Sequence, residues 1–572
     1  MPNYLLLGTC GAGTFVDFPH EGMRTVSHML WDARTPVKLP GDSQQFDAII
    51  VALTQRYIVD DAGDKGNDLL FHRLHAQDQL VTMRDTAYGL ISEQVEHLAT
   101  HFAGRPVFFL AFLEQNFNAR GLLLPNYTLE NPAYFMRQLN EHMERATAAF
   151  ENAHFIDLNQ IVNWIGNGRI NDHLLTATFH GNYLSNWDYD FDRERAVKPT
   201  PATELFNSDD SVRAFKIMFW ETIENALSII RRENTVKLII IDLDDTLWRG
   251  IAAEDDLEPH QRIEGWPLGF AEALLYFKNR GGLLAISSKN DAQKTLENMQ
   301  RIYGWRITPH DFASVKIGWN RKSEGVAEIL KEINILPENA VFIDDNPREV
   351  DDVLAAFPGI RTLGFDHYLW RSKILLDPAF QVPHVSEESR NRTALAQQSI
   401  KRREEKAAIP HDEWLQSLQL VAKIDMISSE EHPKFKRAFE LLNKTNQFNT
   451  TGKRWDNAEI FALFQRGGGL ISISVADKSI DNGLTGVAVI DGASIEQAVL
   501  SCRVFGLGIE NMLTHAALEK ILLDHDSATA RLTNTGKNFS CHDHFKQYGF
   551  DHTDAGWVTK VVGTKPAWIQ LV

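Results

Sequence analysis

The chain has 572 residues, which is more than one hydrophobic core usually organises, so its length predicts about three or four domains. Its 58 Lys and Arg are outnumbered by 76 Asp and Glu, and the acidic residues are scattered along the sequence. The dense basic run at residues 401–403 is followed directly by Glu404 and Glu405, so we interpret it as a solvated helix face. This balance excludes the basic footprint of a nucleic-acid-binding protein, and no nucleic-acid partner is expected.

The distribution of cysteine and apolar residues is typical of a cytoplasmic protein. Three cysteines, Cys10, Cys502 and Cys541, are a small and odd number for so long a chain, which argues against a disulfide framework. No basic residue precedes the leucines at 5–7, so a secretory signal is not expected. The longest apolar stretches, such as residues 107–113, are too short to span a bilayer, so we expect no membrane partner.

Strands alternate with helices in the first third of the chain, which predicts a parallel sheet within an α/β domain over residues 1–200. The proline-containing loop at 198–201 marks its end, and residues 201–234 are expected to form a helical linker. The linker helix places four apolar side chains on one face: Phe215, Phe219, Ile223 and Leu227. The strands expected in the first domain are 4–7, 46–53 and 106–112, and the helices are 91–102 and 134–150.

The alternation is clearest in residues 235–385, which we assign to a doubly wound parallel sheet. The strands of this segment are continuous apolar runs, as expected of central strands that are buried on both faces. Strands are expected at 236–241, 283–286 and 340–343, and helices at 270–278, 292–303 and 324–333. The charged segment 386–410 is expected to be a connecting helix. The last segment, 411–572, mixes helices with strands at 469–475 and 486–490, which predicts a third, α+β domain.

Carboxylates follow two of these apolar strands. Asp242 and Asp244 come after the first, and Asp344 and Asp345 directly follow the last. Ligands of doubly wound sheets bind beyond the carboxyl ends of the strands, so these four acids are expected to converge at one edge. They would repel one another without a cation, and Mg²⁺ would relieve that repulsion because it favours a few carboxylates together with waters and phosphate oxygens.

This edge of the sheet has the groups that phosphoryl transfer requires. Asp242 could be the nucleophile and Asp244 the general acid/base. Ser288, at the end of the strand 283–286, could hydrogen-bond a phosphoryl oxygen, and Lys322 could place an ammonium group beside it. One acid after a strand is often only a helix N-cap, but that explanation does not account for the whole ordered set.

The ordered set resembles the four motifs of the haloacid dehalogenase (HAD) superfamily of phosphatases. The resemblance implies that Asp242 forms an aspartyl-phosphate and that Asp244 protonates the leaving group and then activates water. The implied phosphate-binding residues are Thr246, Ser288, Asn290 and Lys322, with Ser287 as second choice for Ser288. The implied magnesium ligands are Asp242, Asp344 and the Asp244 backbone carbonyl, with Asp345 as second choice. Residues 246–288 leave no room for a large cap domain, so the neighbouring domains are expected to cover the site.

Longer stretches resemble the FkbH-like proteins, whose phosphatase domain belongs to HAD subfamily IIIC. The stretches are 242–256, Ser288-Lys-Asn290, Phe342-Ile-Asp-Asp-Asn-Pro347, Asn443-Lys-Thr-Asn-Gln-Phe-Asn449 and Ser501-Cys-Arg-Val504. Members of that family take a phosphoglyceryl group from 1,3-bisphosphoglycerate, dephosphorylate it and load a glyceryl thioester onto an acyl carrier protein. Others accompany polysaccharide or polyketide gene sets. The sequence departs from the family at Asp245 and Arg249, where Asn and Gly are usual.

The third domain carries an Arg503-Val-Phe-Gly506-Leu-Gly508 stretch before a helix-like segment, 509–522. Such a turn into a helix N-terminus exposes backbone amides that can hold pyrophosphate. The stretch resembles the CoA-binding turn of GNAT acyltransferases, which implies that CoA or the phosphopantetheine of a carrier protein binds at Arg503, Gly506 and Gly508. An ordinary strand-turn-helix is the alternative. Asn446 and Gln447 are either pantetheine or acyl contacts or simply polar loop residues.

Cys502 directly precedes this turn. A thiolate there could accept an acyl group if a helix dipole or Arg503 lowers its pKa. A buried cysteine within a strand is the alternative interpretation.

The first domain carries a weaker signal. The Gly8-Thr9-Cys10 turn lies where SGNH hydrolases keep their nucleophile, and His180 could be a distant partner, but the expected Gly-Asp-Ser sequence is missing. We therefore interpret this domain as an SGNH-like scaffold or docking surface without catalysis of its own.

Three functions remain open at this point. The first is a phosphatase that also loads an acyl group onto a carrier protein. The second is a small-molecule or sugar phosphatase joined to a CoA-dependent N- or O-acyltransferase in polysaccharide or secondary-metabolite biosynthesis. The third is an assembly protein without catalytic activity. The carrier protein, the final product and the oligomeric state are not specified by the sequence.

Overall fold

The structure is a computed structural model of the whole chain. It describes residues 2–9, 12–16, 25–31, 38–54, 58–59, 76–170, 209–252, 254, 256–408, 411–478, 481–553 and 556–572. The chain forms two compact units. The first comprises Met1–Leu227 with Asp456–Ala458, and the second comprises Ser228–Trp455 with Glu459–Val572.

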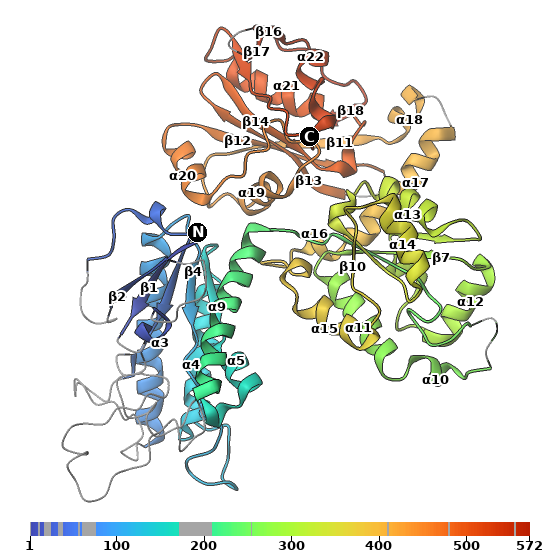
Figure 1. Cartoon of the computed structure of the whole chain (residues 1–572). Coiled ribbons are helices and arrows are strands. Elements are labelled where there is room, and N and C mark those ends of the chain that lie inside the picture. Colours follow the sequence, from blue (N-terminus) through green and yellow to red (C-terminus); the bar gives the residue numbers. More distant parts are fainter. Residues whose placement is uncertain are drawn as a thin grey trace, which may run out of the picture. The chain divides into compact units, whose positions relative to one another are not determined.

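The first unit contains a parallel sheet with the strand order β2-β1-β3-β4-β5 (Figure 1). The predicted α/β alternation is therefore confirmed, although strands β2 and β5 were not predicted. Its described strands are β1 (Asn3–Gly8), β2 (Thr25–Leu30), β3 (Ala48–Ala52), β4 (Val107–Leu110) and β5 (Ala153–Ile156). Its described helices are α1 (Gly13–Val16), η2 (Ser43–Gln45), α3 (Gln77–His101), α4 (Pro132–Thr147), α5 (Leu158–Ile165) and η3 (Asn167–Arg169).

Helix α9 (Asp209–Arg231) leads out of the first unit. Its predicted apolar face is confirmed, because Phe215, Phe219 and Ile223 are fully buried. Phe219 stacks on Phe15, and Trp220 donates a hydrogen bond from Nε1 to the Phe15 carbonyl at 3.2 Å. The helix is thus packed by aromatic contacts to the first unit rather than being a solvated linker.

The second unit begins with a parallel sheet of strand order β10-β9-β6-β7-β8. Its strands are β6 (Leu238–Ile241), β7 (Leu283–Ser288), β8 (Ser314–Ile317), β9 (Ala340–Ile343) and β10 (Arg361–Thr362). The described helices are α10 (Pro259–Ile263), α11 (Trp266–Asn279), α12 (Ala292–Tyr303), η4 (Pro309–Asp311), α13 (Lys322–Ile333), η5 (Pro337–Asn339), α14 (Pro347–Ala356), α15 (His367–Leu376) and η6 (Pro378–Phe380).

Strand β6 is buried on both faces, as its unbroken apolar sequence predicts. Ile239 and Ile241 belong to one core cluster together with residues of α11, whereas Leu238 and Ile240 belong to a second cluster together with residues of α13. Successive side chains of a strand point to opposite faces, so the two clusters fix the register of β6. A fixed β6 determines where the residues at its two ends lie.

The connecting segment is helical, as predicted, and consists of α16 (Glu387–Arg390) and α17 (Arg392–Ala408), followed by α18 (His411–Ser417). The predicted mixture of helices and strands beyond it is also confirmed. Here the strands form a mixed sheet of order β16-β17-β15-β14-β13-β12-β11-β18. They are β11 (Leu420–Ile427), β12 (Gly469–Ala476), β13 (Asp481–Asp491), β14 (Ser494–Leu500), β15 (Ala528–Ala530), β16 (Asp551–Thr553), β17 (Gly556–Thr559) and β18 (Ile569–Leu571).

Helices cover both faces of this mixed sheet. Ile471 and Ile473 of β12 pack in a cluster with residues of α21 (Ile509–Ile521), whereas Leu470 packs in a cluster with residues of α19 (Phe435–Lys444) and α20 (Asn457–Gln465). The short helical elements η7 (Cys502–Val504), η8 (Phe539–Cys541) and α22 (His544–Tyr548) complete the domain. Among the described residues, no helix combines the length and the apolar character that crossing a bilayer requires.

Candidate active site

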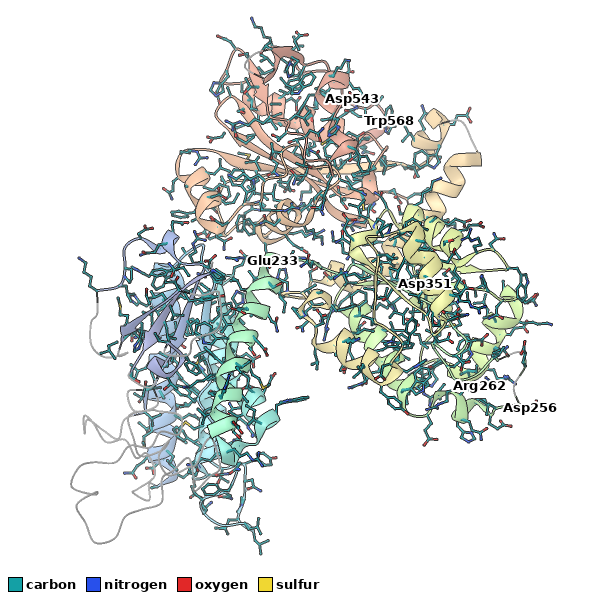
Figure 2. All side chains as sticks on the ribbon, in the orientation of Figure 1. Glu233, Asp256, Arg262, Asp351, Asp543 and Trp568 are labelled. Carbon is teal, nitrogen blue, oxygen red and sulfur yellow. The ribbon has the colours of Figure 1, made fainter. Side chains whose placement is uncertain are left out.

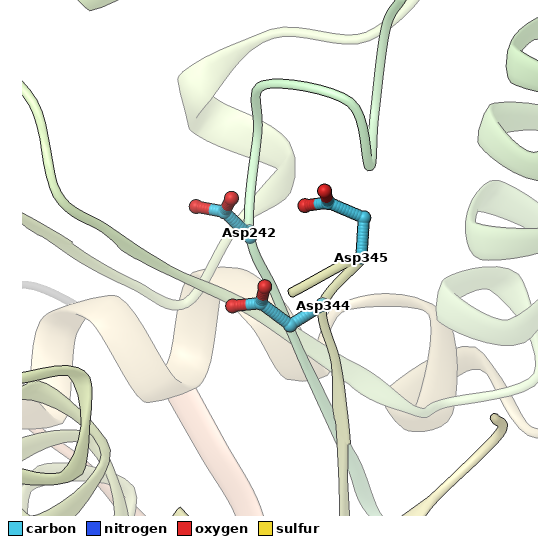
Figure 3. Close-up of side chains that lie close together, drawn as sticks. All are labelled: Asp242, Asp344 and Asp345. Atoms are coloured by element: carbon cyan, nitrogen blue, oxygen red, sulfur yellow. The ribbon is translucent and has the colours of Figure 1, made fainter. Parts of the chain in front are cut away.

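Three carboxylates meet at one edge of the parallel sheet of the second unit (Figure 3). Asp242 follows β6, and Asp344 and Asp345 follow β9, which pairs with β6 in parallel with Ile241 opposite Ile343. This register brings the three aspartates together, and one oxygen from each lies within 4.8 Å of the others. The predicted convergence of acids at the carboxyl ends of the strands is therefore present for these three residues.

Lys322 joins two of these carboxylates. It is the first residue of α13, and its Nζ lies 3.0 Å from Asp242 Oδ2 and 2.5 Å from Asp344 Oδ2. The lysine side chain is only 5 % exposed. Burial alone would lower the pKa of Lys322, but the charges of Asp242 and Asp344 raise it. The lysine is thus held as an ammonium group against the carboxylate cluster.

The cluster nevertheless keeps an excess of negative charge. Burial raises the pKa of Asp242 to about 7, although Lys322 acts against this change. Burial also raises the pKa of Asp345, with contributions from Asp344 and Asp245. One ammonium group cannot compensate three neighbouring carboxylates, so a further cation is required for all three to be ionised.

The donor atoms of the cluster suit a magnesium ion. Asp242 Oδ1 is buried and accepts no hydrogen bond from any described residue, so one carboxylate oxygen is left to be satisfied by a ligand. Mg²⁺ binds oxygen atoms and is held in proteins by few carboxylates together with water and phosphate oxygens. Asp242, Asp344 and Asp345 are therefore the residues that fit this ion.

Asp244 is oriented differently from the three clustered aspartates. Its Oδ1 accepts hydrogen bonds from Trp248 Nε1 at 2.7 Å and from the Ala252 amide at 2.9 Å. Its Oδ2 accepts a hydrogen bond from Asn290 Nδ2 at 2.8 Å. Its carboxylate is not one of the three that could share an ion. The loop after β6 thus presents two acids in different environments, one beside Lys322 and one among neutral donors.

The turn that carries these acids depends on two local contacts. Asp245 adopts a left-handed backbone with φ of 52°, and its Oδ1 accepts the Gly250 amide at 2.7 Å. Thr246 is fully buried, and its hydroxyl lies between the Asp345 carboxylate and the Asp345 amide at 3.3 and 3.2 Å. The hydroxyl proposed to bind phosphate therefore links the loops that follow β6 and β9.

Ser288 is the last residue of β7 and is 5 % exposed. A hydrogen bond between its hydroxyl and Asp242 acts to lower the pKa of Asp242, and Asn290 Nδ2 lies 3.4 Å from its Oγ. Ser287 belongs to the same strand, but its hydroxyl donates to the Lys322 carbonyl at 3.5 Å. Asp242, Ser288, Asn290 and Lys322 are thus gathered at this site, as the sequence predicts.

Several contacts of the site were not identified from the sequence. Trp248 supplies the shortest hydrogen bond to Asp244, and an indole nitrogen four residues after a candidate acid is the signal that could have identified it. Lys289 pairs with Glu349 at 2.6 Å, and His367 Nε2 lies 2.8 Å from the Asp245 carbonyl. These partners come from distant parts of the chain, which one sequence does not bring together.

Cys502 lies in the turn η7, after the end of β14, and is partly exposed. The alternative interpretation of a buried cysteine within a strand is therefore wrong, because β14 ends at Leu500 and the chain turns before Cys502. Cys502, Arg503 and Asn446 line one cavity. Arg503 donates from Nε to Ser501 Oγ at 3.0 Å, and the Asn446 side chain accepts a hydrogen bond from Arg454.

Gly506 and Gly508 lie around the start of α21. Gly506 is exposed, and Gly508 is the buried N-cap of the helix, with left-handed φ values of 74° and 82°. Gly508 packs against the C-terminal segment, where a Cβ would lie 3.0 Å from Trp568, which is labelled in Figure 2, and 3.3 Å from Pro566. The conformation and the close approach both require glycine at this position.

The candidate residues of the first domain are described only in part. Thr9 Oγ1 lies 2.9 Å from Thr54 Oγ1, which connects the ends of β1 and β3. Cys10 and His180 lie outside the described residues. The sequence prediction for this domain therefore stays a prediction.

Comparisons with known proteins give likenesses to phosphatases among the solved structures. No family model and no curated protein matches the chain. The chain is similar to a structure of the N-terminal part of the Bacteroides fragilis protein BF1531, which contains a phosphatase domain complexed with Mg. The TM-score is 0.44 at 18% identity, over 67% of this chain and 94% of that one.

A second likeness is to 3-deoxy-D-manno-octulosonate 8-phosphate phosphatase from Moraxella catarrhalis, with a TM-score of 0.20 and 12% identity over 30% of this chain and 95% of that one. The Vibrio cholerae structure described as putatively the same phosphatase gives a TM-score of 0.18 and 19% identity over 30% and 90%. At these scores the site geometry, rather than the likeness, carries the functional assignment.

Proposed function

We propose that the chain is a magnesium-dependent phosphatase of the HAD superfamily that works through an aspartyl-phosphate. The observation that carries this proposal is the buried cluster of Asp242, Asp344 and Asp345, with Lys322 joining two of them and one Asp242 oxygen left unbonded. Mg²⁺ bound to these carboxylates, and to the Asp244 backbone carbonyl, would neutralise charge on the phosphoryl group.

Asp242 acts as the nucleophile. One of its carboxylate oxygens forms a bond to phosphorus while the bond between phosphorus and the leaving oxygen breaks. Lys322 Nζ and the hydroxyl of Ser288 lie beside this carboxylate and are placed to contact the phosphoryl oxygens. Asn290 bonds both Ser288 and Asp244, so it ties the phosphate contacts to the acid.

Asp244 acts as the general acid and then as the base. It donates a proton to the leaving oxygen in the first step and takes a proton from the water that attacks phosphorus in the second. The second step releases inorganic phosphate and restores the Asp242 carboxylate. Three hydrogen bonds from Trp248, Ala252 and Asn290 fix the orientation of the Asp244 carboxyl group for both transfers.

Trapping of the covalent intermediate tests this assignment. The Asp244→Asn variant keeps the nucleophile but cannot activate water, so it should gain one phosphoryl group when incubated with magnesium and acetyl phosphate. The gain is measured by intact-mass spectrometry and located by peptide mapping on Asp242. The Asp242→Asn variant is the matched control and should gain none. Phosphorylation on another residue, or equal labelling of both variants, would contradict the mechanism.

We propose further that the phosphatase serves acyl loading, as the resemblance to FkbH-like proteins implies. The substrate is then the phosphoglyceryl group of 1,3-bisphosphoglycerate, and the acceptor is the phosphopantetheine thiol of an acyl carrier protein. The cavity that holds Cys502, Arg503 and Asn446 supports this proposal, because it places a thiol beside polar groups that pantetheine could contact. Cys502 is the candidate acyl relay, and Gly506 and Gly508 remain candidate contacts of CoA or phosphopantetheine.

The alternative is a small-molecule or sugar phosphatase joined to a CoA-dependent N- or O-acyltransferase. Intact-mass analysis of candidate carrier proteins, incubated with the enzyme, magnesium and 1,3-bisphosphoglycerate, separates the two functions. A glyceryl mass increase on the carrier supports acyl loading. Release of phosphate without carrier modification supports the alternative. If neutralising the carboxylates caused no loss of function, the protein would instead be the assembly protein without catalytic activity.

A further inference from the structure

A cavity of about 430 Å³ lies at the opposite end of the parallel sheet from the carboxylate cluster. Its lining includes Lys237, which directly precedes β6, and Leu283, the first residue of β7. It also includes Asn446, Cys502 and Arg503, and all of these residues belong to the second compact unit. The volume falls in the range of small-molecule sites.

The cavity has a charge opposite to that of the whole chain. Among its described lining residues are nine Lys and Arg but three Glu, whereas the chain carries a net charge of −18. The glutamates are already paired. Glu440 lies 2.9 Å from Lys444, Glu338 lies 3.6 Å from Lys537, and Glu332 lies 2.5 Å from Lys316. Glu440 also lies 3.5 Å from Arg232, so its charge is shared between cations of the lining.

Three of these cations have no carboxylate partner among the described residues. The Lys237 backbone bonds Asn339 and Leu283, but its ammonium group makes no hydrogen bond or ion pair with a described residue. Arg280 donates to the Ile374 carbonyl at 3.5 Å, and Arg454 donates to backbone carbonyls, of which that of Thr445 is the nearer at 2.8 Å. Burial lowers the pKa of all three. The pKa of Lys237 falls to about 8, because burial and Arg392 lower it more than Cys502 raises it. The cavity thus concentrates positive charge that an anion would compensate.

We propose that this cavity binds the phosphate group of a phosphate monoester or free phosphate, with Lys237 as its central contact. A phosphate dianion has several oxygens that can accept from different cations, whereas a carboxylate carries one charge and two oxygens. Charge-assisted contacts from lysine and arginine are the usual means of holding phosphate in proteins.

This site is separate from the carboxylate cluster. Lys237 and Asp242 lie at opposite ends of β6, five residues apart, which corresponds to about 17 Å along a strand. A phosphate held by Lys237 is therefore out of reach of the Asp242 nucleophile. The inference does not depend on which ester is hydrolysed at the carboxylate cluster.

Two sources could supply the phosphate group. One is inorganic phosphate, and the other is free 4′-phosphopantetheine, a phosphate monoester whose thiol arm could extend toward Cys502 and Asn446 in the same cavity. The shared chemistry is the phosphate group, and titrations with different ligands distinguish the sources.

Isothermal titration calorimetry of the full chain with inorganic phosphate tests the site. EDTA is present throughout, because without a divalent cation Asp242, Asp344 and Asp345 repel a phosphate dianion. We expect saturable binding that the Lys237→Met variant weakens by about tenfold or more, since one close charge-assisted contact is lost. Lys294→Met, which changes an exposed lysine of α12, is the matched control and should bind as the unaltered chain does. Absence of saturable binding, or equal binding by Lys237→Met, overturns the proposal.

A second variant keeps the test decisive if Lys237→Met does not fold, which circular dichroism would reveal. Lys537 lines the cavity but its side chain is 61% exposed, so Lys537→Met should fold and weaken phosphate binding by about threefold. Unchanged binding by this variant, with Lys237→Met unfolded, would overturn the site.

The unaltered chain is also titrated with 4′-phosphopantetheine and with pantetheine. Tighter binding of phosphopantetheine than of phosphate identifies the pantetheine monoester as the source, and equal binding identifies free phosphate. Equal binding of pantetheine and phosphopantetheine contradicts a phosphate site. Loss of phosphatase activity would leave these titrations unaffected.

Discussion

The two ends of β6 lie in environments of opposite charge. Beyond its carboxyl end, Asp242 lies close to Asp344 and Asp345, with Lys322 compensating part of their charge. Before its other end, Lys237 lies in a cavity whose described cations outnumber its carboxylates. Four buried apolar residues separate the two environments.

The comparison shows that the surroundings of a buried charge, rather than its burial, decide what it does for the protein. Lys322 and Lys237 are both lysines beside the same sheet. The first contacts two carboxylates, which raise its pKa, whereas the second pairs with no carboxylate of the described part of the chain and its pKa is lowered by burial. The first is therefore bound within the protein, and the second is available to an external anion.

The largest expected effect comes from Asp242→Asn, which removes the nucleophile at the acidic end. An amide does not form the aspartyl-phosphate, so we expect the rate of phosphate release to fall by about 10⁴-fold. The measurement is phosphate release from acetyl phosphate with magnesium present. Phosphate binding to the cavity at the other end of β6, followed by calorimetry with EDTA, serves as the control for an intact fold. A variant that releases phosphate at the normal rate would show that Asp242 is not the nucleophile.

Lys322→Met is expected to have the next largest effect, because it leaves Asp242 and Asp344 without their shared ammonium group. Removing one partner of a buried ion pair typically destabilises a protein by about 3 kcal/mol. We also expect kcat to fall by about 100-fold, because a charge beside the transferred phosphoryl group is lost. Urea unfolding and steady-state kinetics measure the two effects. An unchanged unfolding midpoint would mean that the contacts of Lys322 do not contribute to stability.

The sequence predicted the acidic end of the sheet because its residues occur in short motifs next to apolar strands. Strand β9 and helix α12 have the predicted bounds, and Asp242 and Asp344 directly follow the strands expected to position them. Strand β8 was missed because it has four residues and carries the polar Lys316 in a partly exposed position. Short strands with a polar residue do not differ enough from loops to be recognised by periodicity.

The basic end of the sheet could not be predicted from sequence patterns. Lys237, Arg280, Arg392, Arg454 and Arg503 come from separate segments and are brought together only by the packing of the second unit. None of them lies in a motif with a phosphate-binding spacing, apart from the Arg503 turn. Cys502 illustrates the same limit, because its position beyond the end of β14 depends on where the strand pairing stops.

Trp248→Phe should sharpen the comparison by changing the orientation of an acid without changing any charge. Trp248 Nε1 donates to Asp244 Oδ1 at 2.7 Å, and phenylalanine keeps an aromatic ring but loses this donor. We expect kcat to fall by about tenfold, because proton transfer by Asp244 depends on its orientation. A phenol-type leaving group needs little protonation, so the loss should be smaller for aryl phosphates than for alkyl phosphates. An equal loss for both substrates would indicate a structural effect of Trp248 rather than a role in positioning Asp244.

The smallest expected effect is that of Lys237→Met on the free energy of unfolding without phosphate. Unlike Lys322→Met, this substitution should stabilise the protein. Because burial lowers the pKa of Lys237 from 10.5 to about 8, the unfolded chain binds this proton more tightly than the folded chain. The charged form therefore destabilises the fold at pH 7, and this cost diminishes as the pH rises from about 8 to above 10. Methionine should raise the free energy of unfolding at pH 7 by about 1 kcal/mol, with a smaller gain at pH 10.

Phosphate should stabilise the unaltered chain more than this variant, since only the unaltered chain has the ammonium group. Urea unfolding at both pH values measures these differences, with Lys294→Met as the control. A variant less stable than the unaltered chain at pH 7 would mean that Lys237 is compensated within the protein, and the contrast between the two ends of β6 would then be wrong.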